Sequence, residues 1–93
     1  MLRPGSYVCE LPGDAAGAAG IAVDSEAFAI IDAKSYGVGP AHGSYLLLGD
    51  QVTMTSGPKR GQTFHRLSGG FLRRTEGGVD TALRCVRRVT NNS

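Results

Sequence analysis

The chain has 93 residues and a net charge of only +2 at pH 7. This length excludes two independent hydrophobic cores, so we expect one domain over residues 1–93. No apolar run is long enough to span a membrane as a helix, and no signal-peptide pattern follows Met1.

Charge is distributed unevenly along the chain. Residues 1–50 contain two basic and six acidic side chains, for a charge of −4, whereas residues 51–93 contain eight basic and two acidic ones, for +6. Seven of the eight basic residues in the second half are arginine. This asymmetry predicts an electrically polar molecule with a basic surface.

The first part of the chain predicts a strand and then a loop. In Gly5–Leu11, apolar and polar residues alternate, which places Tyr7, Cys9 and Leu11 on one face. The following segment, Gly13–Ala22, has the sequence GDAAGAAGIA, which is too rich in glycine for a stable helix. We therefore expect a mobile loop there.

The segment Asp24–Lys34 allows two interpretations. It could form a short helix with an N-cap at Asp24 or Ser25. It could also form a strand over Ala27–Asp32 with two inward side chains, Phe28 and Ile30. We favour the strand because every other apolar run in the chain is strand-like.

Residues 43–89 predict a five-strand up-and-down sheet, because short apolar runs alternate with glycine-containing turns. Ser44–Leu48 and Gln51–Thr55 flank Gly49-Asp50, which suits a type II′ hairpin turn. Three further strands are predicted at Gln62–Leu67, Phe71–Thr75 and Thr81–Val89. The large side chains expected to fill the interior of the whole fold are Tyr7, Phe28, Tyr45, Met54, Phe64 and Phe71.

Together these segments predict an all-β fold, a small antiparallel up-and-down barrel of about seven strands. In such a barrel the first and last strands are neighbours, so Cys9 and Cys85 can form a disulfide. A disulfide implies an oxidising compartment, so we expect a periplasmic or secreted protein whose export signal has been removed. The alternative is a cytosolic protein with two buried free thiols.

The basic residues of the second half are the first candidate site. Two glycines flank Lys59 and Arg60 in Thr55–Gly61, which could form an anion-binding loop or a plain hairpin loop. Six arginines on consecutive strands could align into a stripe that binds an anionic partner, or could form a solvated outer face. They are Arg66, Arg73, Arg74, Arg84, Arg87 and Arg88. Few aromatic residues lie among them, so we expect no specific nucleic acid as a partner.

No motif for catalysis, metal binding or cofactor binding occurs in the sequence. His42 and His65 lack acidic or cysteine neighbours at metal-ligand spacing, and no serine lies in a nucleophile-elbow motif. We therefore expect no enzyme, no metal and no cofactor. A cleft with a histidine and a carboxylate in contact would instead favour an enzyme.

Several segments resemble small uncharacterised bacterial envelope proteins. They are Gly5–Leu11 (GSYVCEL), Phe28–Ile30, Gly43–Tyr45, Thr55–Pro58 and Leu83–Arg87 (LRCVR). The predicted architecture is also similar to small lipocalin-like barrels, including periplasmic inhibitors of secreted metalloproteases. The lipocalin Gly-x-Trp motif is absent, because the chain contains no tryptophan. The resemblance implies a β-barrel of the cell envelope and brings no activity with it.

Three functions follow as hypotheses, in order of preference. The first is a non-catalytic binding module of the bacterial cell envelope, which would recognise a protein or an anionic partner through a basic face or barrel-end loops. The second is a lipocalin-like carrier of an apolar ligand, which a filled barrel interior would disfavour. The third is an enzyme acting on an anionic substrate.

Overall fold

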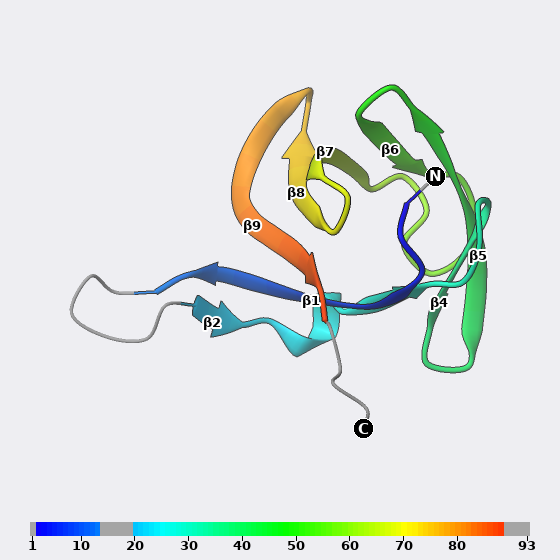
Figure 1. Cartoon of the computed structure of the whole chain (residues 1–93), viewed down its shortest axis with the longest axis horizontal. Coiled ribbons are helices and arrows are strands. Elements are labelled where there is room, and N and C mark those ends of the chain that lie inside the picture. Colours follow the sequence, from blue (N-terminus) through cyan, green and yellow to red (C-terminus); the bar gives the residue numbers. More distant parts are fainter. Residues whose placement is uncertain (1, 14–19, 89–93) are drawn as a thin grey trace.

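The computed structural model describes residues 2–13 and 20–88, which form a closed antiparallel barrel of eight strands with one further strand outside it (Figure 1). The only helical element in these ranges is one 3-10 turn. The elements are β1 (Gly5–Pro12), β2 (Gly20–Ala22), η1 (Asp24–Glu26), β3 (Phe28–Ile30), β4 (Ser35–Val38), β5 (Ala41–Leu48), β6 (Gln51–Met54), β7 (Thr63–Ser68), β8 (Phe71–Glu76) and β9 (Val79–Arg87). The predicted all-β barrel is confirmed.

Strand β1 closes the barrel because it has neighbours on both edges. On one edge it pairs with β9, and on the other its first half pairs with β3 and its second half with β2. From β3 to β9, each strand pairs antiparallel with the next strand in the chain. The architecture is therefore up-and-down, and it is compatible with that of lipocalin-like barrels.

The disulfide lies at the seam between the first and last strands of the barrel. Cys9 and Cys85 are directly opposite in the β1–β9 ladder, with 4.0 Å between their Cα atoms and an S–S bond of 2.05 Å. They are 76 residues apart, and no free cysteine occurs in the described ranges. The predicted disulfide is confirmed, and it fits a protein that folds in an oxidising compartment.

The barrel interior is filled by side chains. Tyr7 and Phe28 stack with ring centroids 5.4 Å apart, and Phe64 lies 5.6 Å from Phe28 at a tilt. The other buried apolar residues of the cluster are Leu2, Cys9, Ile30, Tyr36, Tyr45, Val52, Met54, Leu72 and Cys85. Such a contiguous cluster is the main source of stability of the barrel.

Two buried tyrosine hydroxyls remain hydrogen-bonded within this interior. Tyr7 donates to the main-chain oxygen of Arg3 over 2.8 Å, and Tyr45 donates to that of Asp32 over 2.7 Å. Burial disfavours the ionised form, which raises the pKa of Tyr7 and of Tyr45 above the ordinary value. Both side chains are therefore neutral donors over the physiological pH range.

The barrel has eight strands rather than about seven because β4 was not predicted. In β4, Ser35 and Gly37 interrupt the apolar pattern, yet Tyr36 is completely buried and pairs with Ile30 and Gly43. The ninth strand, β2, lies in the predicted loop Gly13–Ala22, so that prediction is wrong for Gly20–Ala22, which pair with β1. Residues 14–19 of the predicted loop lie outside the described residues.

For Asp24–Lys34, the strand interpretation is confirmed, with Phe28 and Ile30 both buried. Helix is limited to the single turn η1. The strand ends at Ile30, before the predicted end at Asp32, because the chain turns there. The Asp32 carboxylate accepts hydrogen bonds from the amides of Lys34 and Ser35, each 2.9 Å long, which fixes the turn into β4.

The five-strand sheet of the second half is confirmed as β5–β9. Gly49 has a φ of +60°, whereas Asp50, like every other non-glycine residue described, has no positive φ. A type II′ turn at Gly49-Asp50 requires this combination. The inward placement of Phe71 is wrong. Leu72 pairs with Cys85 and is buried, so the adjacent Phe71 faces the other side of the sheet.

Candidate functional site

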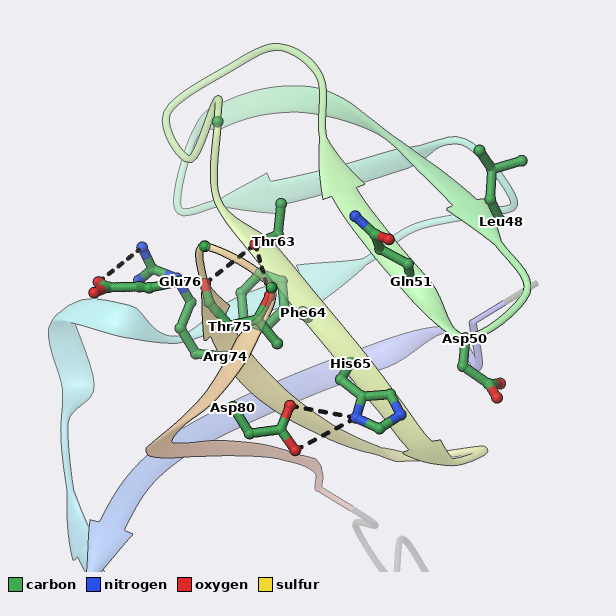
Figure 2. A pocket seen from close by; sticks show the side chains of 13 residues that line it. Leu48, Asp50, Gln51, Thr63, Phe64, His65, Arg74, Thr75, Glu76 and Asp80 are labelled. Atoms are coloured by element: carbon green, nitrogen blue, oxygen red, sulfur yellow. Dashed lines mark hydrogen bonds and ion pairs between the residues drawn. The ribbon is translucent and has the colours of Figure 1, made fainter.

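A hollow of about 740 Å³ lies on the barrel between the β5–β6 hairpin and the β8–β9 turn (Figure 2). Strands β6, β7 and β8 form its floor, and Gly77 and Gly78 of the β8–β9 turn form part of its edge. Both glycines have positive φ, +59° and +82°, which allows the two-residue turn. The other lining residues are Leu48, Asp50, Gln51, Gly61, Thr63, Phe64, His65, Arg74, Thr75, Glu76 and Asp80.

In this hollow, His65 and Asp80 are in contact. The Nδ1 atom of His65 lies 3.3 and 3.4 Å from the two carboxylate oxygens of Asp80, and Figure 2 shows the two side chains facing each other. Each side chain is 44% exposed, so the pair is accessible from solvent. A carboxylate at Nδ1 favours the tautomer with hydrogen on that nitrogen and leaves Nε2 as the acceptor.

The contact between His65 and Asp80 was not predicted, because the two residues belong to strands that are not neighbours. Strand β8 separates β7 from β9, and Thr75 of β8 is opposite both Thr63 and Asp80. The sequence nevertheless contains a signal for the side on which they lie. Successive strand residues point to opposite faces, so the inward Phe64 and Cys85 place His65 and Asp80 on the outer face. Their contact then depends on the register of two hairpins.

Two threonine hydroxyls lie beside the histidine pair. Thr63 Oγ1 and Thr75 Oγ1 are 2.7 Å apart, and Thr63 Oγ1 also donates to the main-chain oxygen of Thr75 over 3.1 Å. If Thr63 donates to the carbonyl, the hydrogen between the two hydroxyls comes from Thr75. Both hydroxyl protons are therefore committed, and neither threonine is arranged as an activated nucleophile.

Arg74 lines the same hollow and is the least compensated of the basic residues around it. Its side chain is only 20% exposed, and its Nε atom is buried with no hydrogen-bond partner among the described residues. The nearest carboxylate, that of Glu76, is 3.9 Å from Nη2 and is itself 74% exposed. Figure 2 shows Arg74 beside Glu76, away from His65 and Asp80.

The candidate anion-binding loop turns its lysine inward. Lys59 is only 5% exposed, its Nζ atom is 3.2 Å from Glu26 Oε2, and it lies 5.6 Å from the centroid of the Phe28 ring. The Lys59 amide donates to the Tyr36 hydroxyl, which donates in turn to the main-chain oxygen of Ser56. The structure therefore favours the plain hairpin-loop interpretation, and only Arg60 of the basic pair is exposed.

Two of the six candidate arginines contact acidic residues of the first half of the chain. Arg84 Nε donates to Glu10 Oε1 over 2.9 Å, and Arg66 Nη2 lies 3.2 Å from Asp50 Oδ1. With Glu26 and Lys59, three ion pairs join the acidic half to the basic half within residues 2–13 and 20–88. The uneven charge along the chain is partly neutralised in space.

The remaining arginines are placed in different surroundings. Arg73 is opposite Arg84 in the β8–β9 ladder, and its Nη1 lies 3.4 Å from the main-chain oxygen of Thr81. Arg87 donates from Nε to the main-chain oxygen of Pro4 over 2.7 Å. Together with the exposed Arg88, it lines a second hollow of about 690 Å³. Anion binding by these residues stays a prediction.

Within residues 2–13 and 20–88, no three His, Cys, Asp or Glu side chains are grouped so that they could hold a metal ion. In the same ranges, no helix has the length and apolar character needed to cross a membrane. No family model matches the chain, and no curated protein and no solved structure matches it significantly.

Proposed function

We propose that this chain is a non-catalytic binding module of the bacterial cell envelope, which holds an anionic group of a partner at Arg74. One observation carries the proposal: the Arg74 side chain is four-fifths buried and lines an open hollow, yet its guanidinium makes no close hydrogen bond to the described residues. A buried donor without a partner costs about 1–3 kcal/mol, and more when it is charged. A ligand that draws the side chain into the hollow and supplies oxygen atoms to its N–H groups would remove that cost.

The chemistry of the guanidinium defines the ligand group. Its planar array of N–H donors matches a carboxylate or a phosphate, which can accept two parallel hydrogen bonds. Competing carboxylates in the hollow are already engaged, since Asp80 contacts His65 and Asp50 contacts Arg66. Among the residues that the structure describes, only Glu76 competes directly for Arg74, and its 3.9 Å contact is too long to be a hydrogen bond.

A periplasmic or secreted location belongs to the same proposal. The buried disulfide supports it, because disulfides persist in oxidising compartments and are rare in the cytosol. Masses of the natural protein after alkylation, with and without prior reduction, provide the test. We expect no alkylation without reduction and two alkylated cysteines after it. Alkylation of both cysteines without reduction would indicate a cytosolic protein.

Titration monitored by amide NMR tests the anion site, with inorganic phosphate and an acetylated poly-glutamate peptide as probes. We expect saturable shifts in the hollow, around Thr75 and Gly77, and weaker binding at higher salt. In Arg74→Met, affinity should fall at least about tenfold, which corresponds to about 1.4 kcal/mol. Arg66→Met is the matched control, because Arg66 already has Asp50 as a partner. Equal affinity of both variants, or no saturable shift, would refute the proposal.

The carrier hypothesis receives no support from the barrel interior. Tyr7, Phe28 and Phe64 occupy its centre, and the other members of the core cluster surround them. An apolar ligand would have to displace these aromatic side chains, which would cost their packing energy. A binding site on the outside of the barrel is therefore the better-supported alternative.

A second candidate function rests on the contact between His65 and Asp80. A histidine whose Nδ1 is held by a carboxylate can accept a proton at Nε2, and the hollow leaves room for a substrate. The corresponding activity would be hydrolysis of an anionic ester, with water as the nucleophile. Release of nitrophenolate from p-nitrophenyl phosphate tests it in His65→Ala and in the control His42→Ala. Loss of turnover in His65→Ala alone would support an enzyme, and equal rates in both variants would count against it.

A further inference from the structure

The strand β2 is the one strand in the described part of the chain that has a neighbour on only one side. All eight barrel strands pair on both edges, whereas β2 pairs with β1 alone. Figure 1 shows β1 and β2 projecting from the barrel as an arm. One edge of this arm is therefore open to pairing with another strand.

The register defines which main-chain groups the open edge presents. The Val23 amide donates to the Cys9 carbonyl over 2.8 Å, and Leu11 is opposite Ile21 two steps further along the ladder. Antiparallel strands alternate their hydrogen-bonding direction from one residue to the next. The N–H and C=O groups of Ile21 therefore face β1, and those of Gly20 and Ala22 face outward.

We propose that β2 pairs with β2 of a second copy of this chain across a two-fold axis at Ile21. In antiparallel pairing centred on Ile21, the outward N–H and C=O groups of Gly20 meet those of Ala22 in the other copy. By symmetry, the groups of Ala22 meet those of Gly20 in the other copy. Four main-chain hydrogen bonds form without any change in the arm. The open edge thus complements itself, as a two-fold interface requires.

The side chains on one face of the arm agree with this arrangement. Ile21 is 56% exposed and Leu11, directly opposite it, is 40% exposed. In the paired arms, Ile21 of each copy lies against its symmetry mate and the two Leu11 side chains flank them. This buries apolar surface that is exposed in the single chain.

The β2 strand also carries no side chain of the kinds that normally prevent such pairing. Exposed edge strands usually carry a charged residue or a proline, whereas β2 has the sequence Gly-Ile-Ala. On the other face of the arm, the Glu10 carboxylate lies against Gly20, where an added Cβ atom would collide with it. The charge of Glu10 therefore points away from the apolar face rather than across the edge.

Sedimentation over a range of concentrations tests the proposal with the full chain. We expect the mass to rise from that of one chain to that of two, and Ile21→Lys to remain a single chain. Leu46→Lys is the matched control, because Leu46 is comparably exposed but lies on β5, which is paired on both sides. Circular dichroism of both variants checks that the barrel still forms.

Cross-linking provides a second measurement that does not depend on a loss of association. Across the two-fold axis, Ile21→Cys places two sulfur atoms at cross-strand distance, so mild oxidation should give a covalent dimer. Leu46→Cys should give none. A single-chain mass at all concentrations, self-association of Ile21→Lys, or equal cross-linking of both cysteine variants would overturn the proposal. The hollow around Arg74 takes no part in this pairing, so either inference can fail alone.

Discussion

Glu10 of the first strand and Arg84 of the last strand are directly opposite in the β1–β9 ladder, with Arg84 Nε 2.9 Å from Glu10 Oε1. The next residue pair along this seam is Cys9 and Cys85. The acidic first half and the basic second half thus meet where the barrel closes. A slip of one residue would move the cysteines outward and bring the charges inward, so the ion pair and the disulfide specify the same register.

Glu10→Gln should lower the free energy of unfolding modestly. Both side chains of the pair are partly exposed, so we expect a loss of about 0.2–1 kcal/mol at low salt. The loss should shrink at higher ionic strength, because salt screens exposed charges. Urea denaturation at two salt concentrations measures it. Glu76→Gln is the control, since its contact with Arg74 is 3.9 Å long and Glu76 is mostly exposed. A salt-independent loss would contradict an electrostatic origin.

Replacement of both cysteines by alanine should lower the free energy of unfolding far more than Glu10→Gln does. The disulfide closes a loop with a sequence separation of 76, and its chain-entropy effect on the unfolded state is roughly 4 to 5 kcal/mol. That is a large fraction of the stability of a small domain. We expect a much lower unfolding temperature, or no folded protein, measured by circular dichroism. An unchanged unfolding temperature would show that the unfolded state is not constrained by this bond.

The buried Lys59 and the partly buried Glu26 should be coupled energetically. Lys59→Met leaves Glu26 without its partner near the Phe28 ring, and we expect a loss of about 1–3 kcal/mol, because Glu26 is still partly hydrated. In the double variant with Glu26→Gln, the loss should be smaller than the sum of the two single losses. Denaturation of all four proteins measures this coupling. Additive losses would mean that the two side chains do not interact.

Asp32 should make stability depend on acid pH. The amide of Lys34, and then that of Ser35, donates to its carboxylate, which lowers the pKa of Asp32 below the ordinary value of 3.8. A depressed folded pKa means that the contribution is present above the unfolded pKa and disappears as pH falls through the folded pKa.

The measurement compares the wild type with Asp32→Asn in thermal unfolding from neutral pH downward. We expect the wild type to be more stable at neutral pH and the two proteins to converge as Asp32 becomes protonated. Asp24→Asn is the control, because it removes an exposed carboxylate in the turn η1 and leaves Asp32 and its two hydrogen bonds in place. A difference between wild type and Asp32→Asn that persists at the lowest pH would contradict this account.

Much of the fold could be predicted from local alternation. The inward positions of Tyr7, Cys9, Phe28 and Ile30 follow from a period of two, which any strand must have. The glycine-containing turns in the second half predict that consecutive strands pair, and the disulfide follows once the ends of the chain become neighbours. These inferences need only the nearest residues along the chain.

Other features depend on contacts that no local pattern contains. Phe71 and Leu72 are both apolar, and only the pairing of Leu72 with Cys85 decides which one faces inward. Lys59 looks like an exposed loop residue until the loop packs over Phe28 and beside Glu26.

The amino-acid sequence by itself determined most of the strand pattern, the closed all-β architecture and the cysteine pair, because side-chain alternation and turn chemistry act over a few residues. Only the tertiary structure decided that β4 completes the barrel, that His65 meets Asp80 across β8, and that the buried Nε atom of Arg74 has no hydrogen-bond partner among the described residues. These relationships depend on the register between strands, and register arises from the packing of the whole barrel.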